Sequence, residues 1–157
     1  MKGFDFVIVA FQPWDYEIGS NAKNIALEFA KHNRVLYVNL PLDWSTLISE
    51  KDKTKIEKYL QVIKGKEEGL VKIQDNIWKL YPDYTAMSIN WIKNPRIYDR
   101  FNRKNNKRFA ACIQDALKKL SFINFIVFND SLMFNGLYLK ELLKPRHYIY
   151  YVRDYLV

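Results

Sequence analysis

The sequence has 157 residues, enough for one domain with a sizeable hydrophobic core but not for two typical domains. Hydrophobic residues make up 49% of the chain, a share that excludes intrinsic disorder despite a net charge of +8. One cysteine and two histidines exclude an intramolecular disulfide and a zinc site built from four such ligands. The positive charge is compatible with an anionic membrane, a nucleic acid or another anionic partner.

The amino-terminal 40 residues have the pattern of a βαβ unit. Residues 4–11 are a continuous apolar run rich in β-branched and aromatic side chains, typical of a strand covered on both faces of a parallel sheet. Ser20 is a suitable N-cap for a helix ending near Asn33. Residues 34–40 predict a second strand, which Pro41 ends. A strand, a helix and a strand at this spacing predict a parallel pair with a right-handed crossover.

The middle of the chain is less regular. Residues 43–66 form a polar, lysine-rich stretch with weak helical character. Residues 70–74 and 77–81 are short strand-like runs separated by Asp75-Asn76, a tight-turn sequence. We therefore predict a β-hairpin here.

A long amphipathic helix is predicted from Pro95 onward, with the proline in its first turn. Its apolar face comprises Ile97, Phe101, Phe109, Ile113, Ala116, Leu117 and Leu120. A basic stripe lies away from that face, formed by Lys93, Arg96, Arg100, Arg103, Lys104, Lys107 and Arg108. Such a stripe can bind anionic lipid head groups or a charged polymer, although a solvated helix face is the more common explanation.

The last third of the chain repeats the alternation of strand and helix. Residues 122–128 predict a buried strand, and the polar residues 129–131 can cap a helix that continues to about Leu143. Residues 148–152 predict the final strand. The chain as a whole therefore predicts an open, mostly parallel α/β sheet with a β-hairpin, whose functional residues lie at the carboxyl ends of the strands.

Three polar segments follow predicted strands and are candidate site residues. The loop after the first strand is long and contains Trp14 and Asp15, but it has only Gly19 and therefore no glycine-rich phosphate-binding motif. Asn129-Asp130 and Arg153-Asp154 each come directly after a buried strand, where an acid can accept hydrogen bonds from hydroxyls or orient a nucleophile.

Each candidate also has a structural explanation. Trp14 can pack beneath its neighbours, Asp130 can cap the next helix, and Asp154 can form an ion pair. His32 and His147 have no metal-ligand partner at a useful spacing, and Cys112 lies near the buried side of the long helix. We assign no catalytic role to these last three residues.

The segments FDFVIVAFQPWDYEIGSNAKNIALEFAKHNRVLYVNLP, IVFND and YIYYVRDYLV, taken together, resemble the amino-terminal half of bacterial glycosyltransferases of the GT-B class, group 1 type. The resemblance implies that residues 1–157 form a single Rossmann-like, acceptor-side domain with helices on both faces of the sheet. Trp14, Asp15, Gly19 and Ser20 match the first loop of the family. Asp154 matches an acidic residue that commonly follows a late strand.

The sequence also departs from the family pattern. Many relatives have a Gly-Gly pair in the first loop and a histidine after a later strand, and this chain has neither. The donor-binding domain of the family carries two glutamates separated by seven residues, and no two glutamates here have that separation. We therefore expect the donor-binding domain to be absent from this chain, which alone would be inactive.

The resemblance implies transfer of a sugar, with retention of configuration, from a nucleotide-sugar donor to a saccharide or lipid-linked acceptor, without a cofactor or an obligate metal. Asp154 would be the catalytic residue. Substrate-binding residues would be Trp14, Asp15, Gly19, Ser20, Asn129, Asp130 and Arg153. We expect a cytoplasmic protein that can also associate with the inner face of the membrane. The nucleotide-sugar donor would be bound mainly by the other domain.

A noncatalytic α/β module that docks on an anionic membrane or polymer is the alternative. Nucleic-acid binding is not expected, because no helix-turn-helix, zinc or aromatic-sheet signature accompanies the basic charge.

Overall fold

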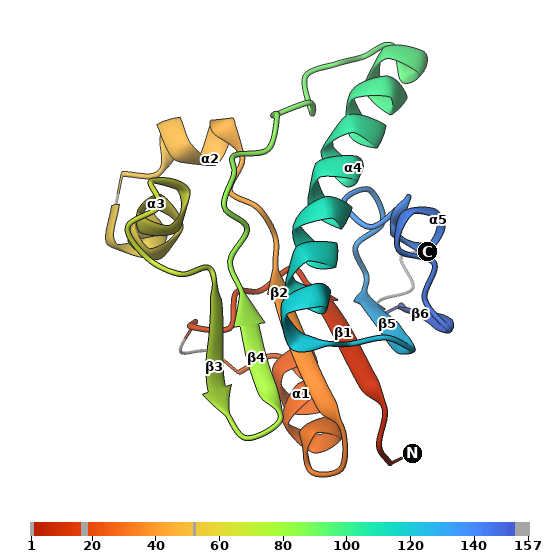
Figure 1. The fold of residues 1–157 in the computed structure, drawn as a ribbon. Coiled ribbons are helices and arrows are strands. Elements are labelled where there is room, and N and C mark those ends of the chain that lie inside the picture. Colours follow the sequence, from red (N-terminus) through yellow and green to blue (C-terminus); the bar gives the residue numbers. More distant parts are fainter. Residues whose placement is uncertain (1, 17–18, 52, 153–157) are drawn as a thin grey trace.

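The computed structural model describes residues 2–16, 19–51 and 53–152, which form an α/β sheet with helices on both faces (Figure 1). The six strands of the described chain lie in the order β3-β4-β2-β1-β5-β6, and only β3 and β4 pair in the antiparallel sense. Their bounds are β1 Asp5–Ala10, β2 Arg34–Asn39, β3 Leu70–Gln74, β4 Ile77–Leu80, β5 Phe125–Asp130 and β6 His147–Tyr151. The predicted open, mostly parallel and Rossmann-like sheet is confirmed.

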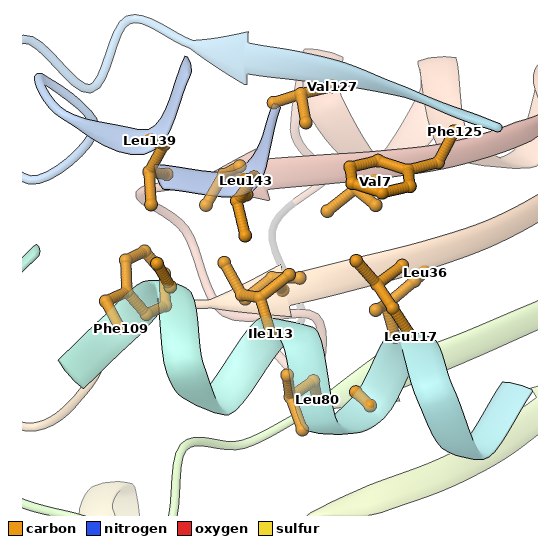
Figure 2. Packing of buried hydrophobic residues seen from close by; sticks show 14 of the residues in the cluster. Val7, Leu36, Leu80, Phe109, Ile113, Leu117, Phe125, Val127, Leu139 and Leu143 are labelled. Carbon is orange, nitrogen blue, oxygen red and sulfur yellow. The ribbon is translucent and has the colours of Figure 1, made fainter. Parts of the chain in front are cut away.

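Strand β1 is the centre of the sheet, and its side chains alternate between two hydrophobic clusters. Phe6 and Ile8 pack in the cluster beneath helix α1 (Asn21–Ala30). Val7 and Val9 pack in the opposite cluster, beneath helices α4 (Pro95–Leu120) and α5 (Leu139–Leu143). Figure 2 shows this second cluster, with α4 and α5 side chains directed toward those of the strands. The continuous apolar pattern of the strands therefore reflects helices on both faces.

Three short helices occupy the segment predicted to have weak helical character. They are α2 (Trp44–Ser49), the 3₁₀ helix η1 (Lys53–Ile56) and α3 (Glu57–Ile63). Asp43 caps α2, because its Oδ1 accepts a hydrogen bond from Thr46 N at 2.7 Å. These helices pack on a third, smaller cluster, which comprises Leu42, Ile56, Tyr59, Val62 and Tyr81. Among the described helices, none combines the length and apolar character needed to cross a bilayer.

The predicted hairpin and the predicted long helix are both present. Asn76, in the turn between β3 and β4, has a positive φ of 64°, a conformation that asparagine tolerates. Strand β4 also pairs with β2 in parallel, so the hairpin extends the main sheet. Helix α4 starts with Pro95 after the N-cap Asn94 and ends at Ser121, which has a left-handed conformation.

The predicted apolar face of α4 is only partly correct. Phe109 and Ile113 are buried, but Ile97 and Phe101 are 48% and 38% exposed. The reason is geometric, because the first turns of α4 extend beyond the carboxyl ends of the strands, where the sheet offers no surface to pack against (Figure 1). Arg108 of the basic stripe is exposed and also contacts the chain, since its guanidinium lies 4.3 Å from the centroid of the Tyr84 ring.

The helix predicted from residues 129–131 to about Leu143 is wrong in length. Residues 131–138 form turns, and α5 includes only the last five residues of the predicted helix. Ser131 has a positive φ of 58°, which interrupts a right-handed helix. Asp130 lies at the end of β5, and α5 begins after Tyr138 without a side-chain cap.

Side-chain amides of α4 stabilise these turns in place of helical hydrogen bonds. Asn102 and Asn106 each donate an Nδ2–H to the Phe134 carbonyl, at 3.2 Å and 3.1 Å. Asn106 Oδ1 accepts a hydrogen bond from Tyr138 N at 3.2 Å. Both asparagines are almost completely buried, so polar positions on the inner face of α4 hold the turn that follows β5.

Replacing Asn106 by alanine should therefore lower the free energy of unfolding by about 2 kcal/mol, because the substitution leaves buried backbone groups of the turn unpaired. Urea denaturation followed by circular dichroism measures the change. Asn24→Ala, at an exposed position of α1, is the matched control and should change stability by less than about 0.5 kcal/mol. Equal effects of the two substitutions would contradict this role of Asn106.

Candidate functional site

The strand order places a candidate site at the carboxyl ends of β1 and β5. From β1 the chain proceeds to β2 and β4 on one side, and then returns to β5 and β6 on the other. Ligands of open α/β sheets bind at such a reversal point. Ala10, Asn39, Asp130 and Tyr151 are aligned across four neighbouring strands there, and we call these four residues the strand-end row. The predicted convergence of the ends of the first, fifth and last strands is confirmed.

The strand-end row lies on the face of the sheet that α1 covers. Ala10 belongs to the same hydrophobic cluster as Phe6 and Ile8, and the row continues this face across the sheet because side chains alternate along parallel strands. Asn39 and Asp130 flank Ala10 and are 0% and 1% exposed. The carboxyl edge therefore holds two buried polar side chains, one on either side of a small apolar one.

Of the four residues in this row, the sequence analysis selected only Asp130, and the buried polar residue that it missed is Asn39. Its Oδ1 accepts a hydrogen bond from Trp14 N at 3.0 Å, whereas its buried Nδ2 has no hydrogen-bond partner among the described residues. A buried amide N–H without a partner carries an energetic penalty, which a ligand oxygen or a water molecule can remove. Asn39 lies within the run 34–40 that the sequence predicts as a strand, so a search for polar residues after strands did not select it, although it is the one polar residue near the end of that apolar run.

Trp14 is a buried anchor of the first loop. Its side chain is 7% exposed and packs edge-to-face on Tyr37, with ring centroids 5.1 Å apart. Lys23 of α1 donates a hydrogen bond to the Trp14 carbonyl at 3.1 Å, and its Nζ lies 5.1 Å from the centroid of the indole ring. The described contacts of Trp14 therefore fix the position of the loop relative to β2 and α1.

Asp15 is held on the β4 side of the sheet. Its carboxylate pairs with Lys79 Nζ at 2.6 Å and accepts a hydrogen bond from Tyr81 Oη at 2.7 Å. Burial opposes ionisation of Asp15, but the hydrogen bonds from Lys79 and Tyr81 and the charge of Lys79 outweigh it and lower the pKa of this carboxyl group. Burial and the adjacent carboxylate raise the pKa of Tyr81, which remains a hydrogen-bond donor.

The described partners of Asp15 lie on the other side of β1 from Asp130. Strands β2 and β1 lie between β4, which carries the partner of Asp15, and β5. The first loop thus begins at Ala10, beside Asp130, but its residue Asp15 pairs with Lys79 on the other side of β1.

Gly19 and Ser20 directly precede helix α1. Ser20 is the N-cap, and its Oγ accepts a hydrogen bond from Lys23 N at 3.2 Å. An added Cβ at Gly19 would meet no atom within 4 Å, so this glycine lies in open space at the carboxyl edge. The structure therefore explains Ser20 by capping and leaves Gly19 accessible.

Asn129 points to the face opposite Asp130 and has a structural role. Its Oδ1 accepts from Leu132 N at 2.8 Å, and its Nδ2 donates to Leu132 O at 3.2 Å and to Tyr148 Oη at 2.7 Å. A side chain at Gly136 would collide with the Asn129 amide. The predicted acid Asp154 and its neighbour Arg153 lie outside the described residues.

Polar groups of the described residues also lie away from the carboxyl edge. A cavity of about 310 Å³ includes His32 and Arg34 at the amino ends of the strands, where Arg34 forms a bidentate pair with Asp5 at 2.7 Å and 2.8 Å. Burial raises the pKa of the Cys112 thiol to about 11, so this thiol is protonated at neutral pH. Among the described residues, no three His, Cys, Asp or Glu side chains are grouped so as to hold a metal ion.

Comparisons of the chain with protein-family models, with curated proteins and with solved structures gave no match.

The ion pair of Asp15 should make stability depend on pH in a defined direction. Because the pKa of Asp15 is lowered by folding, its contribution is fully present above the unfolded-state pKa of about 3.9 and is lost as the pH falls through the folded-state value. Asp15→Asn should therefore lower the urea midpoint at pH 7, and its difference from the wild type should shrink below about pH 4.

Asp75→Asn is the matched control for this pH series. Asp75 is also paired with a lysine, but its side chain is 97% exposed, so its removal should hardly change the midpoint at any pH. A difference between Asp15→Asn and the wild type that stayed constant down to pH 2.5 would contradict the lowered pKa.

Proposed function

We propose that this chain is the acceptor-binding domain of a glycosyltransferase of the GT-B class, which transfers a sugar from a nucleotide-sugar donor with retention of configuration. The observation that carries the proposal is the pair of buried polar side chains, Asn39 and Asp130, on either side of Ala10 at the reversal point of the sheet. The similarity of the sequence to the amino-terminal half of such enzymes supports the same assignment.

The strand-end row has the chemistry that a saccharide requires. Sugar hydroxyl groups both donate and accept hydrogen bonds, so a carboxylate and an amide N–H are complementary partners. Asp130 would accept a hydrogen bond from one hydroxyl group, and the Asn39 Nδ2, which has no described partner, would donate to another. The partly exposed ring of Tyr151, the fourth member of the row, offers an apolar surface to the C–H face of a sugar.

The same arrangement suggests a division of labour in the transfer reaction. The domain would hold the acceptor at the carboxyl edge, and a second Rossmann-like domain would bind the nucleotide-sugar, as the resemblance implies. Asp154 would hydrogen-bond the acceptor or the transferred sugar, and Arg153 would contribute to binding. Lys79 and Tyr81, which hold Asp15, and the contacts of Trp14 would keep the first loop in place, so these residues would act as positioning residues.

Acceptor binding should be detectable in the 157-residue chain by titration with alkyl glycosides below their micelle concentration, followed by ¹⁵N NMR. The side-chain amide signals of Asn39 and the backbone signals near Asp130 should shift. Asp130→Asn should weaken binding by about tenfold, because a charge-assisted hydrogen bond contributes about 1.5 to 3 kcal/mol. Asp154 lies outside the described residues, and the same titration with Asp154→Asn tests whether its carboxylate contributes to acceptor binding.

Asn24→Ala, on the exposed side of α1, is the control variant and should bind like the wild type. The Trp14 indole signal reports whether the first loop remains anchored in each variant. Shifts confined to the opposite edge of the sheet, or equal affinities of the wild type and Asp130→Asn, would contradict the assignment of the row.

Donor binding should behave differently in this chain. Isothermal calorimetry with UDP-sugars and GDP-sugars should give no measurable heat, because the proposed division of labour assigns the nucleotide to another domain. Transfer of sugar to an alkyl glycoside, followed by mass spectrometry, should also be absent. Tight nucleotide-sugar binding with transfer by these 157 residues would contradict the proposed acceptor-only role.

A further inference from the structure

Several large apolar side chains are exposed on the elements at the end of the molecule where α2 and the first turns of α4 extend beyond the sheet. They come from α2, from the segment before α4 and from α4 itself. We call these five the apolar docking residues: Trp44 (52% exposed), Ile48 (79%), Trp91 (76%), Ile97 (48%) and Phe101 (38%). Clusters of large apolar side chains at a protein surface commonly mark an interaction site.

Hydrogen bonds connect α2 to the segment that precedes α4. Trp44 N donates to Ala86 O at 3.2 Å, and Ser45 N donates to Ser88 Oγ at 2.6 Å. The Trp91 indole N–H donates to Ser88 O at 2.8 Å. Trp44 and Trp91 are therefore held around Ser88. Ile48 follows Trp44 by four residues and lies on the same side of α2.

Helix α4 borders the same segment. The Asn105 side chain accepts a hydrogen bond from Met87 N at 3.1 Å and donates one to Met87 O at 2.9 Å. Phe101 and Ile97 precede Asn105 by one and two helical turns, so they continue its side of α4. Figure 1 shows α2, this segment and the first turns of α4 at one end of the molecule. The apolar docking residues thus come from elements at the same end of the molecule, which the segment before α4 connects.

Four exposed basic residues accompany this apolar group. Arg96, Arg100 and Lys104 recur every four residues along α4, and Lys93 lies just before the helix. These four form no ion pair with the described part of the chain. By contrast, Arg103 pairs with Glu141 at 3.5 Å and stacks on the ring of Tyr138. We call Lys93, Arg96, Arg100 and Lys104 the basic docking residues.

We propose that the apolar and basic docking residues together bind the domain to the surface of an anionic lipid bilayer. Tryptophan and isoleucine side chains can enter the interfacial layer, where indole rings are favoured, while the cations contact lipid phosphates. An anionic polymer would use the charges but gain little from Ile48 and Ile97. The combination of both residue types therefore favours a membrane, and the inference holds whatever reaction the site supports.

The test uses the 157-residue chain and sedimentation with vesicles of phosphatidylcholine alone or with 30% phosphatidylglycerol. Binding should require the anionic lipid and weaken in high salt. The triple variant Arg96→Gln, Arg100→Gln, Lys104→Gln should bind at least tenfold more weakly, because each basic residue near the surface contributes to the attraction. The control is the triple variant Lys72→Gln, Lys118→Gln, Lys119→Gln, which removes three positive charges from exposed lysines outside the docking residues. This control should bind nearly like the wild type.

A second pair of variants tests the apolar contribution. Trp44→Ser, Ile48→Ser, Trp91→Ser should lose most binding to anionic vesicles, whereas Ile123→Ser, at a site that is 81% exposed, should not. Brominated lipids should quench tryptophan fluorescence in the wild type, because two of its four tryptophans are docking residues. Circular dichroism spectra that match the wild type establish that each variant is folded.

Two results would overturn the proposal. One is equal sedimentation of the wild type and both docking variants. The other is binding to polyphosphate or RNA that matches vesicle binding and is unaffected by loss of the three apolar side chains, which would assign the surface to a polymer.

Discussion

The pairing of β1 with β2 on one side and with β5 on the other is the constraint on which the rest of the structure depends. Residues 5–10 contribute hydrogen bonds to both neighbours, and their side chains supply both hydrophobic clusters. The connection from β1 to β2 and the connection from β4 to β5 run in opposite directions across the sheet. Because such connections are right-handed, their helices α1 and α4 lie on opposite faces. The same connections place the carboxyl ends of β1 and β5 side by side. The strand-end row, and with it the proposed acceptor site, follows from this single arrangement.

The regular elements could be predicted from the sequence because their signals are local. The apolar runs of β1 and β5, the Asn76 turn and the Pro95 start of α4 depend on neighbouring residues alone. The turns between β5 and α5, where the sequence predicts a helix, could not be predicted in the same way. Its turns are stabilised by Asn102 and Asn106, which are distant in sequence and look like ordinary polar positions of a helix.

The candidate site was predicted in position but not in composition. The strand-end rule correctly located Asp130 at the edge, yet Asn129 proved to bind its own turn, and Asp15 was drawn to Lys79 on the far side of β2. Whether a polar side chain points to one face of a strand or the other depends on register, and the partner of Asp15 depends on strand order. Both are tertiary properties, so spacing in the sequence could not distinguish these residues from Asn39.

Helix α4 connects the proposed membrane-docking residues to the turn that follows Asp130. Its 26 residues form a rod of about 39 Å, with the docking residues at one end and Asn106 bound to the turn after Asp130 further along. Attachment of the first turns to a bilayer would set the height of the carboxyl edge above the lipid head groups. A lipid-linked acceptor would then be presented at a defined distance from the membrane.

The two edges of the sheet differ in how they can meet another strand. At the β3 edge, the pairing with β4 is interrupted by a register shift between Lys72 and Gln74, and the lysine is exposed. Irregular, charged edges discourage intermolecular association. At the other edge, β6 is regular and carries the exposed rings of Tyr150 and Tyr151. The irregular, charged β3 edge is therefore less suited to pairing with another strand than a regular edge such as β6.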